Sequence, residues 1–129
     1  MKEISLSKKQ LQNIYADLGE PKIREILTDF YRRMSTDLML GFFFTDKDLH
    51  PIVEQQLKFL LRAMGSITSY SGKPPANAHT ELPPILSGHF DRRLVILRET
   101  LNAHHVNCAL ISTWLTFEES FRDAVVTSK

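Results

Sequence analysis

The chain has 129 residues, a length that suits one domain, residues 1–129, with a single hydrophobic core. Hydrophobic residues make up 43% and charged residues 24%, as in ordinary soluble globular proteins. The net charge is +1, and Lys and Arg are scattered among Asp and Glu. Because nucleic-acid binding needs a basic patch or stripe, we expect no nucleic-acid partner.

Membrane and secretory signals are also missing from the sequence. No apolar run approaches the roughly 18–20 residues that a membrane span needs, and the N-terminus lacks the apolar block of a secretory signal. The single cysteine, Cys108, excludes an internal disulfide and fits a reducing compartment. We therefore expect a cytoplasmic protein without membrane contact, as a monomer or weak dimer.

Hydrophobic spacing and capping residues predict an all-α fold without strands. Gly19 ends the first helix, and Pro21 suits the first turn of the second. Asp48, Ser87 and Asn107 are expected to begin later helices. The expected helices cover about 7–18, 21–36, 49–64, 88–102 and 107–126, with a short apolar turn at 38–44.

Each expected helix has one apolar stripe at 3-and-4 spacing. The inward residues of the second helix are Ile23, Ile26, Leu27, Phe30, Tyr31 and Met34. Those of the following helices are Ile52, Gln56, Phe59, Leu60 and Ala63, then Phe90, Leu94, Leu97 and Leu101, then Leu110, Trp114, Phe117, Phe121 and Ala124. Three phenylalanines, 42–44, are expected to wrap a corner, and the pair Glu118-Glu119 to form a solvated face.

Three polar side chains fall on these apolar stripes: Tyr31, Gln56 and Arg93. A buried polar group without a partner costs roughly 1–3 kcal/mol, so each needs an explanation. In one account Tyr31 and Gln56 bond to each other while Arg93 extends to the surface. In the other, these groups face a cavity and donate hydrogen bonds to a small polar ligand such as dioxygen.

The stretch from 70 to 90 contains four of the six prolines, so no ordinary helix crosses it. His79 lies on this stiff segment, where a metal or haem ligand would be held, although loop histidines are most often solvated. Elsewhere, His50 is expected to be exposed, and His104-His105 to interact with a helix C-terminus. The sequence contains no Ser/His/Asp set, H-E-x-x-H motif, phosphate-binding glycine loop or Cys cluster.

Several motifs, taken together, resemble those of the truncated haemoglobins, the short two-on-two globins. The motifs are D-F-Y (Asp29 to Tyr31), L-G-F-F-F (Leu40 to Phe44), Q-x-x-F (Gln56 to Phe59), Y-S-G-K-P-x4-H (Tyr70 to His79) and the following E-L-P-P-I-L-S-G-H-F. The resemblance covers roughly residues 14–106. The proline segment is similar to the third group of the family, and the Tyr31–Gln56 pair to the first.

The resemblance implies a globin-like two-on-two helical sandwich around haem b, iron protoporphyrin IX. His79 would be the proximal iron ligand, in preference to His89, which opens the next helix. Tyr31 and Gln56 would be the distal hydrogen-bonding pair. The other haem-contacting residues would be Phe44, Ile52, Phe59 and Leu60, and Lys73 or Arg93 would meet a propionate.

The function implied is reversible binding of oxygen and other diatomic gases, CO and NO. Ile52 and Gln55 are poor iron ligands, so we expect a five-coordinate ferrous form. The runner-up is nitric-oxide dioxygenation, an enzyme activity that needs a separate reductase. The third hypothesis is a helical interaction domain that kept the globin fold without haem.

Overall fold

The structure, a computed structural model, describes residues 8–65 and 84–126. Every element in these two ranges is helical, as the sequence predicts. In chain order they are α1 (Lys8–Ser35), the 3₁₀ helix η1 (Gly41–Phe44), α2 (Leu49–Ala63), α4 (Ser87–Ala103), α5 (Cys108–Glu119) and α6 (Arg122–Val125). Among the described helices, none has the length and apolar character to cross a membrane.

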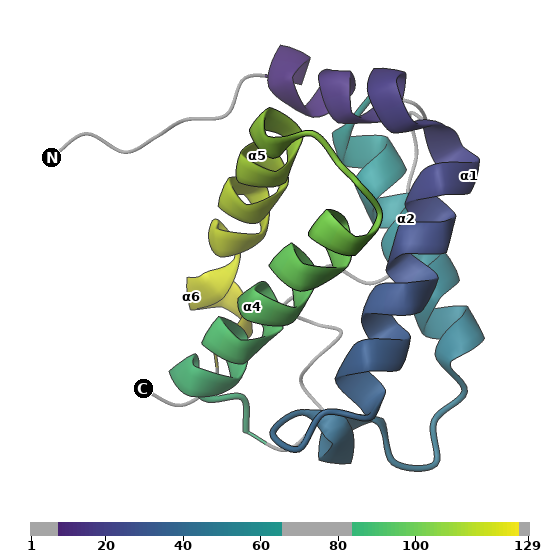
Figure 1. The fold of residues 1–129 in the computed structure, drawn as a ribbon. Helices are drawn as coiled ribbons and strands as arrows, with labels where there is room; N and C mark the ends of the chain where they lie inside the picture. The colour runs from purple at the N-terminus through teal and green to yellow at the C-terminus, as the bar shows by residue number, and fades with distance from the viewer. Residues whose placement is uncertain (1–7, 66–83, 127–129) are drawn as a thin grey trace, which may run out of the picture.

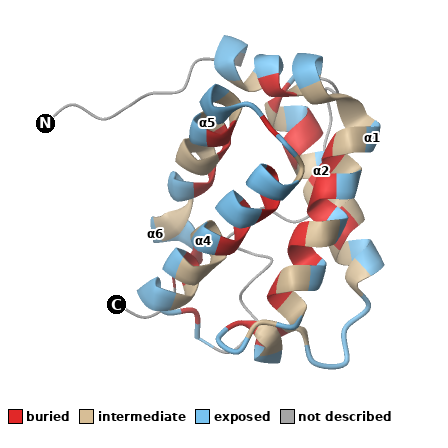
Figure 2. Cartoon of the chain, viewed as in Figure 1, coloured by how far each residue is buried: buried red, intermediate tan, exposed pale blue. Residues whose placement is uncertain are grey.

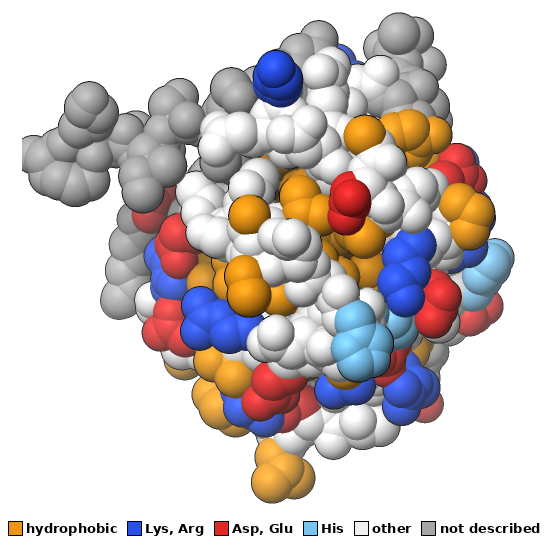
Figure 3. Space-filling view, turned by 45° about the horizontal axis from the view of Figure 1, so that its top comes forward, with side chains coloured by type: hydrophobic (Ala, Val, Ile, Leu, Met, Phe, Trp, Pro, Cys, Tyr) orange, Lys and Arg blue, Asp and Glu red, His pale blue; other side chains and the backbone are white. Residues whose placement is uncertain are grey.

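Two antiparallel helix pairs enclose the core (Figure 1). The second part of α1 runs against α2, and α4 runs against α5, while α1 also packs on α4 and α5. Buried residues lie on the sides of these helices that face one another (Figure 2). On the outside, acidic and basic side chains are interspersed over the face seen in Figure 3.

The boundary predicted at Gly19 is confirmed as a break inside α1. Gly19 has φ 79° and ψ 161°, a left-handed backbone that residues with a Cβ adopt only with strain. Pro21 follows at the start of the next turn, where a missing N–H costs no hydrogen bond. All six apolar-face residues expected beyond the break are buried: Ile23, Ile26, Leu27, Phe30, Tyr31 and Met34.

The three phenylalanines of η1 wrap a corner as expected. Phe43 is buried, Phe44 is half-buried, and Phe42 is 49% exposed. The next helix then starts at the predicted cap, because the Asp48 carboxylate accepts a hydrogen bond from the backbone N–H of His50 at 3.1 Å. His50 is exposed, which was also expected.

The buried face of α2 differs from the predicted stripe. The buried residues of α2 are Val53, Leu57, Leu60 and Leu61, whereas Ile52, Gln56, Phe59 and Ala63 are only half-buried. The side of α2 that contains Val53 and its neighbour Glu54 faces α1. There the Glu54 carboxylate accepts a hydrogen bond from Arg24 of α1 at 2.8 Å. The predicted stripe therefore lies on a neighbouring face of α2 and has only Leu60 in common with the buried residues.

Two predictions about the last helices are wrong. Ser87 does not cap α4; the cap is Leu86, whose N–H donates to Nδ1 of His89 at 3.0 Å, and Ser87 instead accepts from Arg122 at 2.8 Å. Asn107 does cap α5, accepting from the N–H of Ala109 at 2.7 Å. The helix stops at Glu119, however, and the chain turns into α6.

The turn between α5 and α6 also changes which residues face inward. Arg122 binds Asp91 of α4 at 2.6 Å and so pulls α6 towards the start of that helix. Because of this turn, Val125 is buried and Ala124 is exposed, contrary to the prediction for Ala124. Trp114 is buried as expected, and Leu110, Phe117 and Phe121 pack against the core while partly exposed.

Candidate functional site

Tyr31, near the end of α1, is held among aromatic rings. Its side chain is 8% exposed. Its ring meets Phe30 edge-on at 5.3 Å between centroids and Phe44 of η1 at 6.0 Å. The helix and the corner after it thus bring together two residues that the sequence assigned to one site.

A buried ion pair lies next to Tyr31. Arg93 of α4 donates a hydrogen bond to the carboxylate of Glu118 on α5, and the two side chains are 21% and 7% exposed. The Arg93 guanidinium also lies over the Phe30 ring, 5.1 Å from its centroid. The pair therefore joins α4 and α5 beside the buried face of α1.

This pair corrects two expectations for these residues. Arg93 does not extend to the surface, and Glu118 is not part of a solvated face, although its neighbour Glu119 is exposed. Glu118 lies one helical turn beyond Trp114, so it continues the buried side of α5. That spacing places Glu118 on the buried side of α5, and with an arginine on the apolar face of another helix it is the signal that could have suggested a buried pair.

Arg93 and Tyr31 also lie near each other, because the guanidinium and the Tyr31 ring both pack against Phe30, at 5.1 Å and 5.3 Å from its centroid. Burial raises the pKa of the Tyr31 phenol and Glu118 adds to this, while Arg93 acts in the opposite direction. For Arg93, burial alone would lower the pKa, but Glu118 and Tyr31 outweigh it, so the pKa is above its usual value. The site at neutral pH therefore contains a neutral phenol beside a charged guanidinium.

The predicted residues of α2 form a half-buried row. Ile52, Gln56 and Phe59 are spaced at helical intervals on one side of α2. Phe59 contacts Phe117 of α5 and Phe121 at centroid distances of 6.1 Å and 5.5 Å. Leu60 is fully buried, so it belongs to the core. Within the described residues, Arg93 rather than Gln56 is the polar side chain found with Tyr31.

Of the histidines considered as ligands or helix-end residues, the structure describes His89 and His104 but not His79. His79 and Lys73 lie outside the described residues. His89 is in the first turn of α4, where it accepts the N–H of Leu86, and its ring packs against Phe43 at 5.1 Å. His104, at the end of α4, binds Asp29 of α1 at 2.9 Å, a specific partner that the sequence did not reveal.

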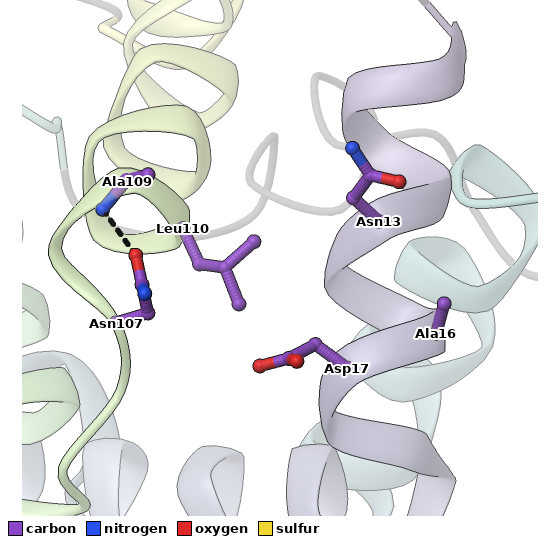
Figure 4. Close-up of a pocket in the computed structure, with 6 residues that line it drawn as sticks. All are labelled: Asn13, Ala16, Asp17, Asn107, Ala109 and Leu110. Atoms are coloured by element: carbon purple, nitrogen blue, oxygen red, sulfur yellow. Dashed lines mark hydrogen bonds between the residues drawn. The ribbon is translucent and has the colours of Figure 1, made fainter.

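A separate cavity of about 350 Å³ lies between the first part of α1 and the start of α5 (Figure 4). Its lining residues are Asn13, Ala16, Asp17, Asn107, Ala109 and Leu110. Tyr31 and Glu118 are near the opposite ends of the same two helices, so this cavity contains none of the predicted site residues. Across the described ranges, no group of three His, Cys, Asp or Glu side chains could hold a metal ion.

Comparison with known proteins decides the family. The model of the family described as "Bacterial-like globin" matches residues 13–127. The chain belongs to the bacterial-like globin family. Within this family it is a truncated haemoglobin, as its motifs predict, because the relatives and the fold described next are those of truncated haemoglobins.

Two relatives of this globin are named "Group 1 truncated hemoglobin". The one from Tetrahymena pyriformis is 30% identical over 102 residues, 78% of this chain and 84% of the relative. The second, "Group 1 truncated hemoglobin LI410" from Chlamydomonas moewusii, is 31% identical over 91 residues, 69% of this chain and 53% of the relative.

The fold of this globin is also found in a solved structure. The 2/2 hemoglobin from Synechococcus sp. PCC 7002, in the cyanomet state and with covalently attached heme, matches with a TM-score of 0.79. The match covers 88% of this chain and 98% of that one, at 24% identity. At this identity the likeness concerns the fold alone, and it confirms the two-on-two helical sandwich.

Proposed function

We propose that this truncated haemoglobin binds haem b through His79 and reversibly binds diatomic gases, chiefly oxygen. Family membership supports haem-based gas binding, and the neighbour from Synechococcus is itself a hemoglobin with covalently attached heme. The observation on which the proposal rests most is the buried Tyr31 side chain, whose hydroxyl is a hydrogen-bond donor and whose ring packs against those of Phe30 and Phe44.

The described residues fit a haem. Haem has two wide apolar faces, and a suitable cleft presents apolar side chains with few polar groups. Ile52 and Phe44 pack against the core but remain partly exposed, and Phe59 is also partly exposed. Two polar side chains accompany them: Tyr31, whose ring contacts Phe44, and Gln56, which lies between Ile52 and Phe59 along α2. We call the space that these five residues are proposed to line the gas pocket.

His79 and three residues of the gas pocket have proposed tasks. A bound haem would supply an iron that can bind a diatomic gas. His79 would hold that iron through a neutral imidazole nitrogen. Tyr31 and Gln56 donate hydrogen bonds to a gas that carries partial negative charge. Ile52 offers no atom that could bind the iron in place of a gas.

Absorption spectra of the purified protein with haem supplied test this function. We expect a sharp Soret band that shifts when the ferric protein is reduced and again when oxygen or carbon monoxide is added. A six-coordinate reduced spectrum would contradict the open axial position. Absence of stoichiometric haem would contradict the proposal as a whole and favour the haem-free interaction domain.

Histidine variants test the proximal assignment. His79→Ala is expected to abolish normal haem ligation, whereas His89→Ala should keep it, because the His89 ring is already engaged in the cap of α4 and against Phe43. Loss of the cap should lower the free energy of unfolding by about 1 kcal/mol without altering the spectrum. If His89→Ala lost ligation and His79→Ala kept it, the assignment would be reversed.

Nitric-oxide dioxygenation remains the alternative function of the same pocket. It needs electrons from a reductase partner, so a single binding experiment does not reveal it. Steady-state consumption of nitric oxide in the presence of oxygen and a general reductase separates the two functions. Sustained turnover would indicate the enzyme, and a single turnover would indicate the carrier.

A further inference from the structure

Three side chains from three helices meet beside the gas pocket: Tyr31 of α1, Arg93 of α4 and Glu118 of α5 (the helices are labelled in Figure 1). Arg93 is fixed from two sides, by the Glu118 carboxylate and by the Phe30 ring below its guanidinium. Both contacts restrict the direction of its remaining N–H groups. The Tyr31 ring packs against the same Phe30 ring, at 5.3 Å between centroids, so Phe30 brings Arg93 and Tyr31 together.

The chemistry of these groups sets the direction of the hydrogen bond. A guanidinium has only donors, so in any hydrogen bond between Arg93 and Tyr31 the phenol oxygen is the acceptor. The hydroxyl hydrogen of Tyr31 then points away from Arg93 and is free to donate elsewhere. The positive charge next to the oxygen also makes the O–H a stronger donor.

We propose that Arg93, held by Glu118, is a positioning residue that turns the Tyr31 hydroxyl hydrogen into the gas pocket. This inference rests on the proposed function. Its consequence is selectivity by ligand chemistry: ligands that accept hydrogen bonds, such as dioxygen, are retained, whereas carbon monoxide, a poor acceptor, is little affected.

Stability alone is a weak reason for this arrangement. A buried ion pair is often no better for folding than apolar side chains of similar volume, because both charges lose their hydration. A guanidinium held beside the phenol by a carboxylate, however, gives the hydroxyl a defined orientation that apolar side chains would not provide. This difference separates a positioning role from a structural one.

Gas dissociation rates provide the first test. The variant Arg93→Met/Glu118→Leu removes both charges together, so that neither is left buried alone and the fold is retained. We expect oxygen dissociation about five- to tenfold faster, and carbon monoxide dissociation changed by less than about twofold. Equal acceleration of both gases would indicate a loosened pocket and overturn the inference.

A double-mutant cycle with Tyr31→Phe tests whether Arg93 influences oxygen dissociation through the Tyr31 hydroxyl. If Arg93 acts through the Tyr31 hydroxyl, adding Arg93→Met/Glu118→Leu to Tyr31→Phe should change the oxygen off-rate by no more than about twofold. Additive effects would overturn the inference. Arg92→Met is the matched control for Arg93→Met, because Arg92 is the preceding residue of α4 and binds Asp37 at 2.7 Å. It should leave both off-rates unchanged.

A measurement without haem provides the second test. In full-length protein containing tyrosine labelled with ¹³C at Cζ, the chain gives three tyrosine signals, and Tyr31→Phe assigns that of Tyr31. Removing the positive charge with Arg93→Met should raise the pKa of Tyr31, and removing the negative charge with Glu118→Leu should lower it. A purely structural change would shift both variants the same way and overturn the inference.

The two proposals fail in different ways. A wild-type protein that takes up no haem contradicts the proposed function, and the inference falls with it even if the titration shows the Arg93–Tyr31 contact. Normal haem uptake combined with additive off-rates contradicts the inference alone.

Discussion

Two arginines of this globin make almost the same contacts in different surroundings. Arg93 binds Glu118 and lies over Phe30, 5.1 Å from the ring centroid, and this is the buried pair. Arg122 binds Asp91 and Glu119 and lies over Phe90 at 4.8 Å, and this is the surface cluster.

The carboxylates distinguish the two sites. The Glu118 side chain is 7% exposed, whereas those of Asp91 and Glu119 are 64% and 47% exposed. Water screens the surface cluster, so each of its ion pairs is worth little. Glu118 has lost its water, and its charge depends on Arg93. Burial, rather than the kind of contact, therefore decides which of the two arginines the protein depends on.

Glu118→Leu is expected to have the largest effect on stability. It leaves the Arg93 charge without its partner, and breaking a buried pair in this way costs about 3–5 kcal/mol. Urea unfolding of the variant measures the loss. The variant Arg93→Met/Glu118→Leu should recover most of it, and if the double variant were as unstable as Glu118→Leu, the uncompensated charge would not be the cause.

The buried pair has a neighbour that the surface cluster lacks, the Tyr31 hydroxyl. Tyr31→Phe removes one hydrogen bond to oxygen worth about 1–1.5 kcal/mol, so oxygen should dissociate about tenfold faster. Stopped-flow replacement of oxygen by carbon monoxide measures the rate. Tyr15→Phe, elsewhere on α1, is the control, and an unchanged off-rate in Tyr31→Phe would rule out a distal donor.

The carboxylate of Asp29 is intermediate in burial between that of the buried pair and those of the surface cluster, because its side chain is 13% exposed. Burial would raise its pKa, but hydrogen bonds from Arg33 and His104 and the charges of Arg33 and Arg32 outweigh this, so the pKa is lowered. A lowered folded-state pKa stabilises the fold above the unfolded value of about 3.9, and this contribution is lost as the pH falls through the folded pKa.

Asp29→Asn should therefore lower the free energy of unfolding by about 1 kcal/mol at pH 7, and by progressively less below about pH 4. Urea unfolding at pH 7 and at steps down to about pH 3 tests this dependence. Asp17→Asn, at an exposed position of the same helix, should show no such difference. A constant difference at all pH values would exclude the ionised carboxylate as the source.

Local patterns in the sequence predicted most of the helices, their caps and the buried face of α1. The 3-and-4 spacing around Phe30 and Tyr31 identified the buried face of α1, and the caps at Asp48 and Asn107 depend on residues two positions away. The partner of Glu118 is 25 residues distant on another helix, so no local pattern contains it. The motif around His79 comes from the sequence alone, since His79 lies outside the described residues.

A distant contact also explains why the sequence did not predict the end of α5 at Glu119. Up to Glu119 the helical spacing continues, and no Gly or Pro announces a stop. Arg122 is held by Asp91 and Ser87 at the start of α4, at 2.6 Å and 2.8 Å, and these contacts favour the turn into α6. Tertiary contacts thus decide a boundary that local preference leaves open.

Arg122→Met should have the smallest effect on the free energy of unfolding. It tests most directly whether burial distinguishes the buried pair from the surface cluster. It removes the same side chain from the same kind of contacts as Arg93→Met, but it leaves only solvated carboxylates behind. We expect a loss of about 0.5–1 kcal/mol in urea unfolding, most of it abolished by about 1 M salt, and no change in oxygen dissociation. A loss as large as that of Glu118→Leu would mean that the turn into α6, rather than burial of charge, determines how much an arginine contributes.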